Sequence, residues 1–204
     1  MEFTFGLYSP KGVTLSIDPN HPYYIGKWIG FQAQNAEKAR ITGIETSFSS
    51  EGNIGDVTIR SLIGYTYMNP VSVNTDSAYR ATFSDTSSNL LKYRFRHLAK
   101  ADVEVEYKKI SLGFSIRYNS YMKNIDRVFE DPIILNTYIL PGLKNYRREH
   151  QTGSLFFDVR AGYDINEHYR VGIVVNNLFN SEYMGRPGDI LPPRSFIAQF
   201  QLKF

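Results

Sequence analysis

Apolar and polar residues alternate along most of the chain with a period of two. The C-terminal segment shows this well, because even positions from 196 to 204 are apolar and most odd positions are polar. Strict alternation is typical of a β-strand with one apolar and one polar face. The same pattern recurs in residues 1–7, 57–67, 101–107, 110–118, 155–163 and 169–175. A less regular stretch at 27–50, with Glu45 on an otherwise apolar parity, completes a prediction of about eight strands.

Strand length and loop length both favour a membrane barrel. Most predicted strands span about 9–13 residues, whereas strands of soluble proteins average about 5–6 residues and transmembrane strands need about 9–11. Short connections are predicted at 51–55, 108–109 and 166–167, and long ones at 9–26, 70–97, 123–153 and 179–192. This alternation is typical of outer-membrane barrels. We therefore expect an all-β fold, an antiparallel transmembrane β-barrel arc with short periplasmic turns and long extracellular loops.

Charged residues of both signs occupy polar positions in the middle of several predicted strands. They are Arg60, Arg117, Asp158, Arg160 and Arg170. In a soluble β-sandwich this face would meet solvent, whereas in a membrane barrel it lines the lumen and the apolar face meets lipid. The alternation of apolar and polar positions is therefore compatible with both the sandwich and the barrel.

Aromatic residues at the strand ends favour the barrel. One set lies beside the short turns and the other toward the long loops, as expected of two interfacial girdles. The first set is Tyr107, Tyr163, Tyr169 and Phe204, and the second is Tyr65, Tyr67, Tyr118 and Tyr121.

Composition narrows the remaining choices. Aromatic residues make up 15% of the chain, which argues against disorder. The absence of Cys removes disulfides, thiolate metal sites and cysteine nucleophiles. A net charge of +3 is too balanced to indicate nucleic-acid binding. No apolar run is long enough for a membrane-spanning helix.

Three stretches resemble one known family. Residues 34–45 read QNAEKARITGIE, residues 64–70 read GYTYMNP, and residues 175–183 read VNNLFNSEY before PPRSF at 192–196 and a terminal Phe204. Together they resemble the C-terminal barrel of TonB-dependent outer-membrane receptors.

The resemblance implies a 22-stranded barrel around a plug, of which residues 1–204 would be the C-terminal part. The plug, the N-terminal strands, a TonB box and a signal peptide are not found, so we expect a fragment that begins at an internal Met. The implied function is import of a scarce nutrient, such as an iron chelate, haem, cobalamin or a glycan. Its implied partners are outer-membrane lipid, the nutrient ligand and the TonB energy-coupling system, which acts through the absent plug. The alternatives are a complete eight-stranded outer-membrane barrel and a soluble β-sandwich binding protein.

A basic and aromatic run in one long loop is the candidate ligand site. Lys144, Arg147, Arg148 and His150 suit an anionic ligand or lipopolysaccharide, or are simply solvated. Tyr138 and Tyr146 beside them favour a ligand surface, because aromatic residues and Arg are enriched at interaction sites. We therefore predict ligand contacts from Tyr138, Tyr146, Arg147 and Arg148.

The last residue is the other candidate. The resemblance implies that a terminal aromatic, Phe204, is recognised by the barrel assembly machinery. Residues 1–8 and 195–204 are expected to be bare edge strands, which invite pairing with other chains.

Enzymatic and metal chemistry are not expected. No motif of a nucleophilic hydrolase, a phosphate-binding loop or a zinc protease occurs. The histidines His21, His97, His150 and His168 do not have the spacing of metal ligands. We therefore expect a receptor with no catalytic residues, no metal and no cofactor.

Overall fold

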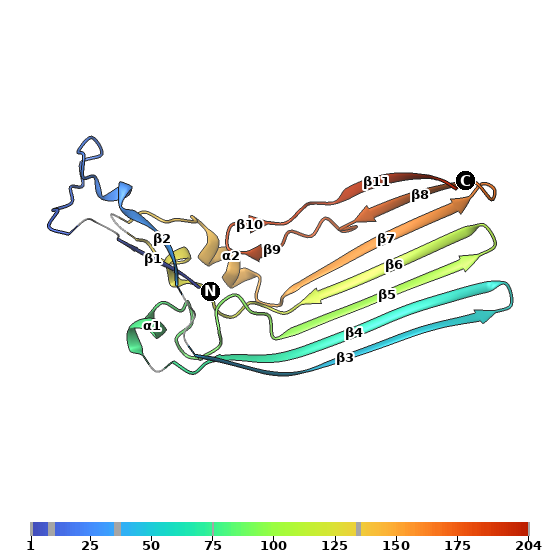
Figure 1. Ribbon diagram of the computed structural model, residues 1–204, viewed down its shortest axis with the longest axis horizontal. Helices are drawn as coiled ribbons and strands as arrows, with labels where there is room; N and C mark the ends of the chain where they lie inside the picture. Colours follow the sequence, from blue (N-terminus) through green and yellow to red (C-terminus); the bar gives the residue numbers. More distant parts are fainter. Residues whose placement is uncertain (1, 8–10, 35–37, 75, 134–135, 204) are drawn as a thin grey trace.

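A seven-stranded antiparallel sheet forms the body of the protein in the computed structural model, which describes residues 2–7, 11–34, 38–74, 76–133 and 136–203. Figure 1 shows the strands side by side in the order β11-β8-β7-β6-β5-β4-β3. Their bounds are β3 (Ala39–Ile54), β4 (Val57–Ser72), β5 (His97–Tyr107), β6 (Ile110–Asn119), β7 (Ser154–Asp164), β8 (Tyr169–Asn176) and β11 (Ser195–Leu202). Apart from β3, each strand hydrogen-bonds to its predecessor in the sheet along the chain.

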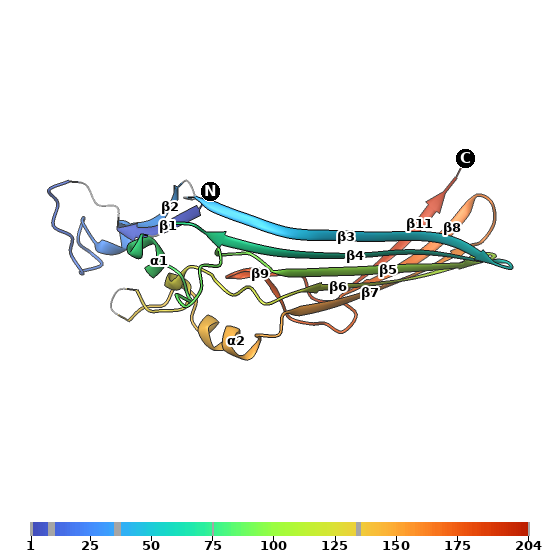
Figure 2. The same cartoon turned by 90° about the horizontal axis from the view of Figure 1, so that it is seen from below.

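The register places the apolar parities of β4 to β8 and β11 on one face. In β3 this face carries Ile44 and Phe48, whereas Glu45 pairs with Thr66 on the other face, so the odd apolar parity expected for 27–50 does not continue through β3. Ile63 of β4 pairs with Ala101, which pairs with Ile116, which pairs with Phe157 of β7. Many large side chains of this face are exposed, among them Ile63, Leu112, Ile173 and Phe200. Figure 2 shows one curved layer, with no second sheet behind it in the described part of the chain. The predicted alternation is confirmed, and the apolar face is the outer one of a barrel wall rather than the core of a sandwich.

Turns and loops lie at opposite ends of the strands, as the alternation of connection lengths predicts (Figure 1). The turn after β5 is Lys108–Lys109, and the one after β7 spans residues 165–168. The first turn differs from the prediction of 51–55, because β3 continues to Ile54 and only Gly55 and Asp56 lie outside the strands. Gly55 has φ 59°, the left-handed conformation that tight hairpin turns require.

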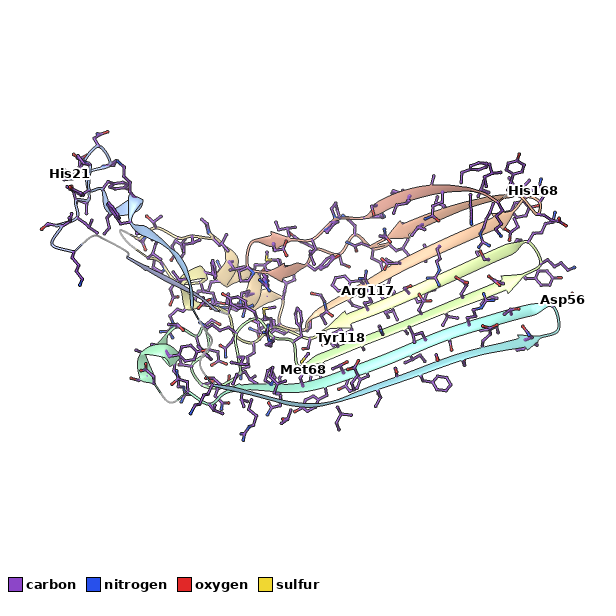
Figure 3. All side chains as sticks on the ribbon, viewed as in Figure 1. His21, Asp56, Met68, Arg117, Tyr118 and His168 are labelled. Atoms are coloured by element: carbon purple, nitrogen blue, oxygen red, sulfur yellow. The ribbon has the colours of Figure 1, made fainter. Side chains whose placement is uncertain are left out.

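Aromatic side chains mark both ends of the apolar face. Tyr107 and Tyr163 both pair with Ile110 beside the turns, and Tyr65, Tyr67 and Tyr118 lie toward the loops. Asp56 and His168 lie at the turn end of the sheet, and Met68 and Tyr118 at the loop end (Figure 3). The girdle prediction is thus confirmed for these five tyrosines, whereas Tyr121 lies beyond β6 with the guanidinium of Arg147 over its ring, and Phe204 lies outside the described residues.

Three long connections after β4, β6 and β8 contain short elements of their own. Loop A (residues 73–96) contains α1 (Ser77–Ala81), and loop B (residues 120–153) contains η2 (Arg127–Phe129) and α2 (Leu143–Glu149). Loop C (residues 177–194) contains the hairpin of β9 (Met184–Arg186) and β10 (Asp189–Ile190). No helix in the described part of the chain is long and apolar enough to cross a membrane.

The N-terminal segment does not form the edge of the main sheet, contrary to expectation. β1 (Glu2–Leu7) pairs with β2 (Ile29–Gln34) in a separate two-stranded sheet, and η1 (Ile25–Lys27) precedes β2. The predicted strand at 27–50 is thus two strands, β2 and β3. The edges of the main sheet among the described residues are β3 and β11.

These edges predict the behaviour of the 204-residue chain when it is expressed alone. Unpaired backbone groups are costly in hydrocarbon and invite pairing between molecules. We expect aggregation through β3 and β11 rather than a discrete monomer in detergent micelles. Gel mobility before and after boiling, together with protease resistance, measures this. A protease-resistant monomer whose mobility changes on heating would show that the chain closes into a small barrel.

The separation of turns and loops also predicts which side of the membrane each faces. The chain contains no Cys, so single cysteines can be introduced for labelling. In a receptor that contains this chain, Cys at position 144 of loop B should react with an impermeant maleimide on intact cells. Cys at position 108 should react only after the outer membrane is opened. Labelling of position 108 but not position 144 on intact cells would reverse the topology.

Candidate functional site: the luminal wall and the loop layer

Ion pairs cross the polar face of the sheet from strand to strand. Arg60 of β4 contacts Glu51 of β3 at 3.1 Å and Glu106 of β5 at 2.9 Å. Its guanidinium also lies 3.5 Å from Glu104. Each pair is partly exposed, so its contribution to stability is small. The arrangement instead gives the face a fixed pattern of charge.

A second group of ion pairs surrounds Arg160 of β7. Its guanidinium donates to Asp102 of β5 at 2.7 and 2.8 Å and to Glu104 at 3.1 Å. Ser115 of β6 donates to Asp102 and accepts from Arg160. Towards the loops, Arg117 contacts Asp158 at 3.0 Å, and Figure 3 places Arg117 near the loop end of β6. A face of this kind suits a polar barrel interior, and we call it the luminal wall.

Loops A and B pack together into one unit, which we call the loop layer. Phe83 of loop A and Ile125 of loop B are almost completely buried, at 1% and 0% exposure. Met122, Ile125 and Leu143 form a core cluster, against which Phe95 and Met184 pack. Most of the buried apolar residues of the described chain lie in or beside these loops rather than on the sheet. The loop layer therefore has its own small hydrophobic core.

Buried polar residues connect the two loops. Asn124 of loop B is fully buried, accepts from the backbone of Asp85 at 2.8 Å and donates to the carbonyl of Leu90 at 2.9 Å. Lys92 of loop A pairs with Asp126 of loop B, and Tyr93 donates to the same carboxylate. Because these groups are buried and satisfied, they specify one arrangement of the two loops. The sequence analysis missed all of them, since no local pattern links residues this far apart.

Arg147, one of the predicted ligand residues, is buried in the last turn of α2. Its guanidinium contacts Glu130 at 2.6 Å and donates to the carbonyls of Met122 and Lys123. It also lies over the ring of Tyr121, 4.8 Å from the centroid. These contacts are typical of a residue that holds a loop in place.

The other predicted ligand residues are more accessible. Arg148 and Tyr138 are exposed, and Tyr146 is half-buried with its ring stacked on His150. Burial raises the pKa of the Tyr146 phenol above its ordinary value, and the carboxylate of Glu182 adds to this. The structure thus places Tyr146, Arg147 and Arg148 on one short helix, with Tyr138 in the segment before it.

A small cavity of about 70 Å³ lies between α2 and β9. Tyr121, Tyr146, His150, Met184 and Arg186 are among its lining residues. Its size suits a few water molecules rather than a nutrient. It marks the place where loop C meets the loop layer.

No group of His, Asp or Glu residues suited to a metal ion occurs in the part of the chain that the structure describes. Phe204, the predicted assembly signal, lies outside the described residues. The preceding strand, β11, does pair antiparallel with β8 through Leu202.

Comparison with known proteins decides the family. The profile described as TonB dependent receptor-like, beta-barrel matches residues 8–178, which is most of the chain. The chain belongs to this family. As a member of the TonB-dependent receptor barrel family it is an outer-membrane protein, and the family consists of transport receptors rather than enzymes.

Solved structures of two receptors share the fold. The ferric-catecholate import receptor Fiu from E. coli K12 has a TM-score of 0.55 and 22% identity over 81% of this chain. The siderophore receptor PiuA from Acinetobacter baumannii has a TM-score of 0.53 and 16% identity, again over 81% of this chain. The chain spans only 21% and 22% of the lengths of these two receptors. No curated protein sequence matched.

Proposed function

We propose that this chain forms part of the barrel of an outer-membrane receptor that imports an iron–siderophore complex. The observation that carries the proposal is a single sheet with a lipid-type outer face, a charged inner face and a structured loop layer at one end. The family match supports the receptor class, and the names of the two similar structures support an iron chelate as cargo. Haem, cobalamin and glycans remain the competing cargoes.

The whole receptor would need more than these residues. We propose that residues 1–204 form the C-terminal part of the barrel, and that a plug in the lumen couples the TonB system to release of the cargo. A barrel wide enough to hold a plug needs many more strands than this arc. The assembly machinery is a further proposed partner, through the predicted signal at Phe204.

Within this function, the loop layer would present the ligand contacts. Tyr138, Tyr146 and Arg148 are the proposed contact residues, because they are the accessible members of the predicted set. Arg147 would act by fixing α2, since its guanidinium is already paired with Glu130. A guanidinium and aromatic rings suit an anionic chelate, because the cation offers charge-assisted hydrogen bonds and the rings offer apolar contact.

Growth under iron limitation tests the cargo. Cells that depend on a receptor containing this chain should grow with ferric catecholates, and deletion of the receptor should abolish that growth. Growth supported only by haem, cobalamin or a glycan would contradict the iron–siderophore assignment.

Binding tests the contact residues. The double change Tyr138→Ala and Arg148→Ala should weaken binding of the ferric chelate by about tenfold or more, as expected when interface anchors are removed. The double change Glu167→Gln and Lys203→Ala at the turn end is a matched control, which should leave the affinity for the ferric chelate unchanged. Unchanged affinity in the loop variant would remove these residues from the site.

A further inference from the structure

Three glycines on the luminal wall share one arrangement. In each case the long cationic side chain of a residue on the next strand lies across the glycine. The three pairs are Gly64 with Lys100, Gly113 with Arg160, and Gly162 with Arg170. In all three pairs the cation comes from the C-terminal neighbour of the strand that carries the glycine.

A side chain at these glycines would occupy the space that the cation uses. A Cβ atom added at Gly113 would lie 2.3 Å from Nε and 2.5 Å from Cγ of Arg160. At Gly64 it would lie 2.9 Å from Cε of Lys100. Both separations are shorter than real contacts of Cβ atoms, so the side chain of the cation would have to shift from its present path.

The glycine at 113 lets Arg160 cross a whole strand. Glu104 of β5 pairs with Gly113 of β6, which pairs with Arg160 of β7. Because Gly113 has no side chain, Arg160 extends over β6 and binds Asp102 and Glu104 on β5. Its two carboxylate partners therefore lie two strands away.

Gly162 of β7 likewise lets Arg170 of β8 extend across β7. Arg170 of β8 contacts Asp164 of β7 at 3.3 Å and extends past Gly162 to donate to Ser111 of β6 at 2.6 Å. An added Cβ at Gly162 would lie 2.6 Å from Oγ of Ser111 and 2.8 Å from Nη2 of Arg170, the two atoms that this hydrogen bond joins. This guanidinium too lies along the wall.

Arginines without such a glycine behave differently. Arg60 is flanked in register by Glu51 and Glu104, and it binds carboxylates on the two adjacent strands only. Arg117 is flanked by Lys100 and Phe156, and it binds Asp158 on the adjacent strand. Crossing a strand thus coincides with a glycine in the path.

We propose that Gly64, Gly113 and Gly162 are positioning residues that hold Lys100, Arg160 and Arg170 flat against the luminal wall. At Gly113 this brings the guanidinium onto two carboxylates and keeps it out of the open lumen. The glycines thereby fix where charge faces whatever occupies or crosses the barrel. The inference rests on the sheet and its register and does not depend on which cargo is imported.

Chemical modification in the receptor containing this chain tests the proposal. Arg160 should react slowly with phenylglyoxal relative to Arg117, whose side chain is 55% exposed. Gly113→Ala should raise the modification rate of Arg160 severalfold while that of Arg117 stays constant. Gly172→Ala is the matched control on the same face, because an added Cβ there meets nothing closer than 3.4 Å. An unchanged Arg160 rate in Gly113→Ala, or an equal rise in Gly172→Ala, would overturn the proposal.

A double variant distinguishes a role of Gly113 in positioning Arg160 from a requirement for glycine in the backbone of β6. Gly113→Ala should lower the yield or the stability of the folded receptor in lipid, and adding it to an Arg160→Ala background should cost little further. If Gly113→Ala prevents folding, the Arg160→Ala change should restore it. The same loss in both backgrounds would show that Gly113 serves the backbone of β6 rather than Arg160.

Discussion

Val159→Arg is expected to weaken folding into a lipid bilayer by about 2–4 kcal/mol, the cost of Arg at the midplane on the lipid face of a barrel. Val159 lies in the middle of β7 and pairs with Phe114, which pairs with Val103. Phe114 and Val103 are both exposed on the outer face, so the guanidinium would enter hydrocarbon. Folding titrations of the receptor in lipid vesicles measure the difference.

Three control variants distinguish the effect of the face from the effect of the depth at which the charge is introduced. Leu62→Arg introduces the same charge at nearly the same depth on the luminal wall, beside Asp102, and should be mild. Phe200→Arg should cost only about 0–1 kcal/mol, since arginine costs less near the interface and Phe200 lies in the row of Val171 and Tyr163 beside the turns. Gln199→Arg, on the luminal side of the same strand, should also be mild. An equal loss from Leu62→Arg and Val159→Arg would contradict the assignment of the faces.

Asp126→Ala is expected to destabilise the loop layer by about 3–5 kcal/mol, because it leaves a buried ammonium without its partner. The side chains of Lys92 and Asp126 are only 4% and 9% exposed. The change also removes the acceptor of Tyr93. Hydrogen exchange of the receptor should therefore become fast in residues 73–96 and 120–133, while exchange in the strands stays slow.

A surface ion pair of the same loop provides the control. Lys144 and Asp131 lie 2.6 Å apart, but their side chains are 49% and 39% exposed. Lys144→Ala should therefore change stability by no more than about 1 kcal/mol. Loop protection that survives Asp126→Ala would show that the apolar core around Ile125 holds the loops without the ion pair.

The faces of the sheet could be predicted because each depends on one local rule. The period of two assigns every strand residue to a side, and the register then aligns those sides across seven strands. The first turn was predicted too early because Gly52 and Asn53 are typical turn residues. In the structure both belong to β3 and pair with residues of β4. The break between β2 and β3 gave no comparable signal.

The site could be predicted only in part, because its contacts join distant residues. Arg147 was predicted as a ligand residue because it lies in a basic and aromatic run. Its carboxylate partner, Glu130, lies in another part of loop B and could not be inferred from that run. The burial of Asn124 depends on loop A. Likewise, Gly113 and Arg160 become neighbours only through the β6–β7 register, so a single glycine in a strand pattern does not reveal its role.

Spin labels along one strand test the central claim most directly. Single cysteines introduced at positions 110 to 119 of β6, in the receptor inserted in lipid, would carry nitroxides whose collisions with oxygen and with a water-soluble nickel chelate are measured. The account predicts a period of two, with even positions such as 112, 114 and 116 accessible to oxygen from lipid and odd positions shielded from it. Uniform accessibility to the nickel chelate, or oxygen accessibility at the odd positions, would contradict a barrel wall with these faces.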